Sequence, residues 1–313
     1  MDNWLPRLVR RLDSLDIGDW TRSDVDRVLA ELGWSIDVED AGLLRTDLPG
    51  GRAGLGTDLD DGPVLSVPIP DGTDLRAAWS LVQEVLGRPT LRGGPGPWLR
   101  WRSEDTTIRL DARSIDLLPT ERFEMTELRT FAHDPDACPY LWCISDGDQF
   151  LPGDRPVDDW DELARRLGTT VAGLISDLPA LGELPVTLSV HGRVSEPDEE
   201  PATCYFKFGE RGLRLEVPAD PWPERVEALT ALGWTPPSGE WITALTDDTF
   251  DWVTTPEGSA SFAAEPGADA ELAAHLAVGA LKDLGLTPQG LSYRVGREGE
   301  SLSAHLPSVG IAR

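Results

Sequence analysis

Cysteine and histidine, the usual zinc ligands, are few in this sequence. His133, Cys138 and Cys143 form the one local cluster of soft ligands, with the spacing H-x4-C-x4-C. A structural zinc site usually has four ligands in two close-spaced pairs, and no second pair is present. Cys143 also sits in an apolar run typical of a buried strand, where a free cysteine behaves as a small apolar residue. We therefore predict no metal site at this cluster.

An acidic stretch resembles a calcium-binding loop only in part. Asp58, Asp60 and Asp61 precede Gly62, but this glycine comes one position early for such a loop. Ile69 stands where the bidentate glutamate would be required. The pattern therefore favours a solvated acidic turn.

The sequence contains no motif typical of a catalytic nucleophile and its base, and none typical of a loop that binds nucleotide phosphates. The glycines of residues 51–56 are in the wrong order for G-x-G-x-x-G, and no P-loop lysine or G-x-S-x-G elbow occurs. The four histidines lie far apart in the sequence: His133, His191, His275 and His305. We predict no catalytic residue and no cofactor. A deep pocket that gathers His191 or Cys204 with carboxylates would instead favour an uncharacterised enzyme.

Twelve tryptophans are the unusual feature of the composition. Most have helix-packing explanations, but four lie on or near expected strands: Trp98, Trp101, Trp241 and Trp252. Trp98 and Trp101 are three positions apart, which places them on opposite faces of one strand, so that one can face outward. An exposed tryptophan suits recognition of an apolar peptide. The four are therefore our candidate partner-binding residues.

Two stretches of the sequence each contain the signals for both the start and the end of a helix. In residues 221–234, Asp220 can cap a helix that starts at Pro221, and Gly233 can end it with Trp234 against Leu229. Residues 20–34 repeat this device, with Thr21 as the cap and Gly33 at the stop. The repeat leaves open whether the two halves are distant duplicates.

The helices and strands predict an α+β protein of two antiparallel-sheet domains packed on helices. We expect an N-terminal domain at residues 1–125, with helices at 1–18, 21–33 and 75–86 and a hairpin at 97–118. Residues 126–155 read as one strand plus a polar linker. The second domain, residues 156–297, has the order α-β-β-β-α-β-β-α, to which residues 290–296 can add a strand, and residues 298–313 read as a loose tail.

Charge and composition limit the classes of partner. The formal net charge is −27 with a pI near 4.4, which repels phosphate backbones and anionic membrane surfaces. No 18 apolar residues occur in succession, and three cysteines do not make a disulfide framework. We therefore expect a cytoplasmic protein that binds no nucleic acid and no membrane.

The second half resembles a known family. The segments WDELARRLG, TCYFKFGERGLRLEVPAD and VEALTALGWTPPSGEWITAL are similar to the actinobacterial TY-Chap family, whose fold is that of type III secretion chaperones and YbjN-like proteins. The resemblance covers roughly residues 156–290. Residues 18–120 are similar to an actinobacterial domain family of unknown function.

The resemblance implies a non-enzymatic holder of a polypeptide client, such as a secreted effector or toxin. The acidic charge would keep such a holder soluble and attract a basic client. The alternative is an immunity or regulatory protein that binds a basic toxin, and the second alternative is an uncharacterised enzyme. We expect a monomer, with a homodimer as the alternative, because two similar domains in one chain can replace a dimer.

Overall fold

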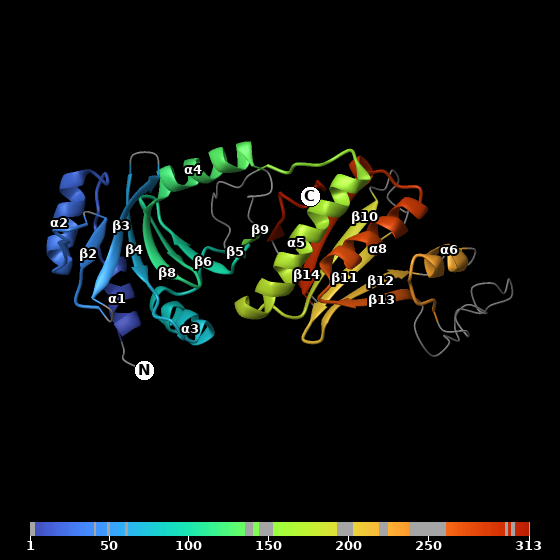
Figure 1. The fold of residues 1–313 in the computed structure, drawn as a ribbon, viewed down its shortest axis with the longest axis horizontal. Helices are drawn as coiled ribbons and strands as arrows, with labels where there is room; N and C mark the ends of the chain where they lie inside the picture. The colour runs from blue at the N-terminus through green and yellow to red at the C-terminus, as the bar shows by residue number, and fades with distance from the viewer. Residues whose placement is uncertain are drawn as a thin grey trace. The chain divides into compact units, whose positions relative to one another are not determined.

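The computed structural model describes residues 4–40, 42–48, 51–59, 62–134, 140–143, 153–192, 203–218, 225–237, 261–297, 300–301 and 304–312. The chain divides into two compact units, Met1–Pro152 and Gly153–Arg313. Each unit combines an antiparallel sheet with helices (Figure 1), which confirms the predicted α+β class. No helix in these described ranges is both long and apolar enough to cross a membrane.

The first unit is built on a mainly hairpin-connected sheet. Its helices are α1 (Trp4–Asp13), α2 (Arg22–Leu32), α3 (Leu75–Leu86) and α4 (Thr120–His133). Its strands are β1 (Ser35–Ile36), β2 (Leu43–Arg45), β3 (Arg52–Leu59), β4 (Gly62–Pro68), β5 (Leu91–Gly94), β6 (Trp98–Arg102), β7 (Thr106–Leu110), β8 (Ser114–Pro119) and β9 (Tyr140–Cys143). They lie in the order β1-β2-β3-β4-β8-β7-β6-β5-β9.

The helix stop predicted at Gly33 is confirmed. Thr21 caps α2 through a reciprocal pair of hydrogen bonds with Asp24, and Gly33 takes the left-handed conformation with φ 70°. The backbone N–H of Trp34 then donates to the carbonyl oxygen of Leu29 at 2.8 Å. This hydrogen bond is characteristic of a Schellman motif. Strand β1 begins directly after it.

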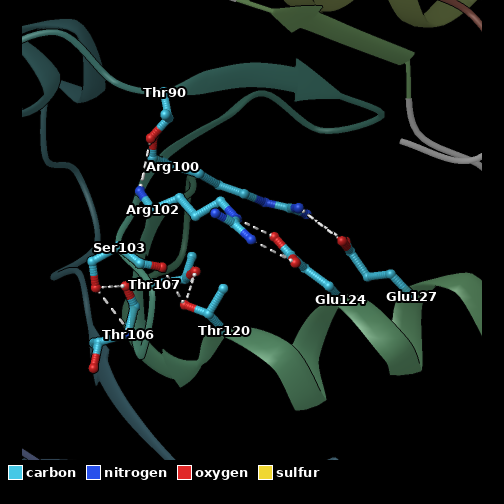
Figure 2. A network of polar contacts seen from close by, with 9 residues as sticks. All are labelled: Thr90, Arg100, Arg102, Ser103, Thr106, Thr107, Thr120, Glu124 and Glu127. Atoms are coloured by element: carbon cyan, nitrogen blue, oxygen red, sulfur yellow. Dashed lines mark hydrogen bonds and ion pairs between the residues drawn. The ribbon is translucent and has the colours of Figure 1, made fainter. Parts of the chain in front are cut away.

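Helix α4 was not predicted, and it overturns the expected domain boundary at residue 125, which falls inside it. Figure 2 shows Arg100 and Arg102 of β6 pointing at Glu127 and Glu124 of α4. The Nε atom of Arg102 lies 2.5 Å from Oε1 of Glu124, and Nη1 of Arg100 lies 2.8 Å from Oε2 of Glu127. The helix therefore binds the sheet through these ion pairs as well as through its buried aromatic side chains, Phe123 and Phe131.

The second unit follows the predicted sequence of elements in the part that is described. It contains α5 (Trp160–Leu181), β10 (Val186–Gly192), β11 (Thr203–Gly209), β12 (Gly212–Pro218), α6 (Val226–Ala231), β13 (Ser261–Gly267), α8 (Ala270–Asp283), a 3-10 turn (Pro288–Gly290), β14 (Leu291–Arg297), β15 (Glu300–Ser301) and β16 (Ala304–His305). The sheet order is β13-β12-β11-β10-β14-β15. Residues 241–255, where two of the strands were expected, lie outside the described residues, as does the predicted start of the Pro221 helix.

The predicted stop at Gly233, at the C-terminal end of α6, is confirmed. Gly233 has φ 104°, and the N–H of Trp234 donates to the carbonyl oxygen of Leu229 at 3.0 Å. Both Leu229 and Trp234 are buried. The same local device therefore ends a helix in each unit.

Residues 304–312 are packed, which corrects, for this part of the chain, the prediction of a loose tail at residues 298–313. Leu306, Val309 and Ile311 are fully buried. The N–H of Val157 donates to the carbonyl oxygen of Gly310, and Ala312 bridges to Ser292 of β14 in parallel. The tail was misjudged because short apolar residues separated by proline and glycine have no period of their own, and their burial depends on a tertiary surface.

Candidate functional site

Among the described residues, helices cover only one of the two faces of the second sheet. Helices α5 and α8 lie side by side on the same face (Figure 1). Residues that alternate inward along the strands are buried there, among them Leu188, Phe206, Leu215 and Val295. No described helix of the second unit covers the other face, which we call the open face.

The open face is polar and charged, with one aromatic ring at its middle. In the described residues it carries Thr187, Ser189, His191, Tyr205, Lys207, Arg214, Glu216, Ala263, Glu265, Ser292 and Arg294. Strand register aligns Glu216, Tyr205, Ser189 and Arg294 in one row across β12, β11, β10 and β14. Side chains in such a row are close enough to contact one ligand together.

Ion pairs occupy one side of the open face. Glu216 accepts a hydrogen bond from Lys207, and its Oε1 lies 2.8 Å from Nε of Arg214. Arg214 also reaches Glu265 at 3.2 Å. Burial raises the pKa of Glu216, but the hydrogen bonds and charges of Lys207 and Arg214 outweigh it, so that the pKa falls below its usual value.

Arg294 differs from these bases. It is exposed and makes no ion pair with any described residue. The row that contains Tyr205 therefore ends, on β14, in a base without an ion-pair partner among the described residues.

The structure separates the two residues that could have indicated an enzyme. His191 lies on the open face with its Nε2 atom 3.1 Å from Oγ of Ser292. Its partial burial, and then the charge of Arg294, lower its pKa, so that the ring is neutral near pH 7. Cys204 points to the opposite, helix-covered face, where complete burial raises the pKa of its thiol. The two residues therefore lie on opposite faces of the sheet.

Two of the four candidate tryptophans are described. Trp98 is buried, and the guanidinium of Arg100 lies 3.9 Å from its ring centre. Trp101 is half-buried on the other face of β6, where its indole N–H donates to the carbonyl oxygen of Gly87 at 3.0 Å. Trp241 and Trp252 lie outside the described residues. Within the ranges that are described, no three His, Cys, Asp or Glu side chains gather as metal ligands.

The fold of the second unit is that of an α+β module in which helices pack on one face of an antiparallel sheet. Residues 154–294 match the family described as T3SS (YopN, CesT) and YbjN peptide-binding chaperone 3, TY-Chap3. This match confirms the resemblance of the second half and supports a chaperone-like, protein-binding role for it. No curated protein and no solved structure matches the chain.

Proposed function

We propose that the second unit holds a polypeptide client on the open face of its sheet. The observation that supports this most is that the unit matching a peptide-binding chaperone family has a sheet face that no described helix covers, with Tyr205 at its middle. Tyrosine gives a large contact area and a hydroxyl at little cost in conformational entropy. The serine and threonine hydroxyls around it can bond to a client backbone.

The client that we propose is a secreted effector or toxin, bound as an extended segment in the cytoplasm. Arg294 would pair with an acidic client residue, while the net charge of −27 attracts basic segments from a distance. An immunity protein is the second candidate function, because the same acidic charge would complement a basic toxin in its folded state.

Affinity capture from the host lysate tests this proposal. The tagged protein should retain one polypeptide in near-stoichiometric amount, and Tyr205→Ser combined with Arg294→Glu should reduce its recovery by about tenfold or more, as expected for loss of a central anchor. Arg211→Glu is the matched charge control, since Arg211 is exposed in the turn between β11 and β12. Absence of a polypeptide, or equal recovery by the double variant, would contradict the proposal.

The folded state of the captured client separates the two candidates. A chaperone client should show little protection of its amides from hydrogen exchange in the complex beyond the bound segment. A toxin held by an immunity protein should show the protection pattern of a folded domain.

A further inference from the structure

The first unit contains a cleft that the proposed function does not use. Its volume is about 570 Å³, and it lies between the end of α1, the end of α3 and the hairpin of β6 and β7. Figure 1 shows α1 and α3 as neighbours at the same sheet. All of its lining residues belong to the first unit.

Apolar and aromatic side chains form part of the lining of the cleft. Leu12, Ile17 and Ile108 line it and are themselves buried. Trp101 adds a half-exposed ring, held in place by the hydrogen bond from its indole N–H to Gly87. A fixed, partly exposed indole is the best protein surface for a cation that stacks on a ring.

Three carboxylates stand at the rim. Asp13, Asp16 and Asp105 line the cleft, are exposed and make no ion pair with any residue that the structure describes. The rim also carries Arg102 and Arg88, but Arg102 is neutralised by its ion pair with Glu124. Three carboxylates therefore face one remaining base, Arg88, among the residues that line the cleft. In addition, α1 and α3 both end at this cleft, and the C-terminal end of a helix favours positive charge.

We propose that this cleft binds a basic side chain, arginine foremost, of an extended peptide segment. The aliphatic stem of the side chain would lie against Leu12 and Ile17, and its guanidinium would stack on Trp101. The carboxylates at the rim would then accept its hydrogen bonds. An anionic ligand is disfavoured by the same three carboxylates.

This inference does not depend on the open face of the second unit. The two sites lie in different units, so variants of one leave the other intact, and each proposal can fail by itself.

The test uses the full chain and the peptide Gly-Gly-Arg-Gly-Gly, followed through the indole ¹⁵N–¹H resonance of Trp101. That resonance is assigned by its loss in Trp101→Phe. We expect a saturable shift with arginine and at least about tenfold weaker binding of the same peptide with citrulline, which keeps the shape but lacks the charge. Asp13→Asn combined with Asp105→Asn should weaken the arginine peptide by a similar factor, and added salt should weaken it further.

Asp71→Asn is the matched control, because Asp71 is exposed before α3 and does not line the cleft. Its affinity for the arginine peptide should equal that of the unchanged protein. Equal binding of the citrulline peptide, saturable binding of inorganic phosphate in place of the arginine peptide, or unchanged affinity in the double aspartate variant would each overturn the proposal.

Discussion

Asp116 of β8 shows how a single buried carboxyl group responds to its surroundings in the first unit. The hydroxyl of Ser66 donates to its Oδ1 atom at 2.6 Å, across the pair of β4 and β8. Burial nevertheless raises the pKa of Asp116, with a smaller contribution from the charge of Asp111, while Ser66, Ser114 and Arg109 oppose this. The ionised form is thus disfavoured in the folded state.

Asp116→Asn should therefore stabilise the protein at neutral pH. Because the folded-state pKa is raised, the ionised carboxylate lowers the free energy of unfolding above that pKa. This penalty fades as the pH falls and is gone below the unfolded-state pKa, roughly pH 4. We expect the variant to raise Tm by a few degrees at pH 7, with the gain shrinking towards pH 4.

Thermal unfolding followed by circular dichroism at several pH values measures this difference. Asp71→Asn, on an exposed turn, should leave Tm unchanged at each pH. A lower Tm for Asp116→Asn at pH 7 would show that the carboxylate stabilises the fold instead.

At the scale of elements, the packing of α5 on α8 depends on a small residue. Gly168 of α5 faces Ala274 of α8, and a Cβ atom placed on Gly168 would lie 3.6 Å from the Cβ of Ala274. That distance is ordinary van der Waals contact. The site therefore has room for one methyl group and for little more.

A graded pair of substitutions tests this spacing. Gly168→Ala should raise the free energy of unfolding by up to about 1 kcal/mol, because alanine is the better residue inside a helix. Gly168→Leu should lower it by about 1–3 kcal/mol, because the larger side chain forces the helices apart. Urea titration measures both. If leucine were tolerated as well as alanine, the close packing of α5 and α8 would be wrong.

At the scale of the whole molecule, the last residues of the chain complete the second unit. Ile311 is fully buried, and a Cβ atom on neighbouring Gly310 would lie 3.3 to 3.4 Å from side-chain atoms of Val157, Arg166 and Leu163. The end of the chain is thereby joined to the start of α5, some 150 residues earlier in the sequence.

Ile311→Ala should consequently destabilise the protein by about 2–5 kcal/mol, the usual result of emptying a buried aliphatic site. Val38→Ala is the control, since Val38 is 94% exposed and its truncation should change the free energy of unfolding by less than about 0.5 kcal/mol. Denaturant unfolding compares the two. Equal stabilities would mean that the tail is not part of the folded unit.

The sequence by itself determined those elements whose cause is local. The stops at Gly33 and Gly233 and the strands of the second unit need only neighbouring residues, and each was predicted. The resemblance of the second half to a peptide-binding chaperone family also came from its own residues.

Only the tertiary structure decided what depends on contacts between distant residues. Helix α4 is held on the sheet partly by the ion pairs of Glu127 with Arg100 and of Glu124 with Arg102, which join residues distant in the sequence. The burial of the tail, the opposite faces of His191 and Cys204, and the cleft beneath Trp101 likewise follow from strand register and helix placement. The periodicity of apolar residues in the sequence indicates which face of a single helix or strand is buried. A binding site forms where the faces of several elements meet, and this depends on the tertiary structure.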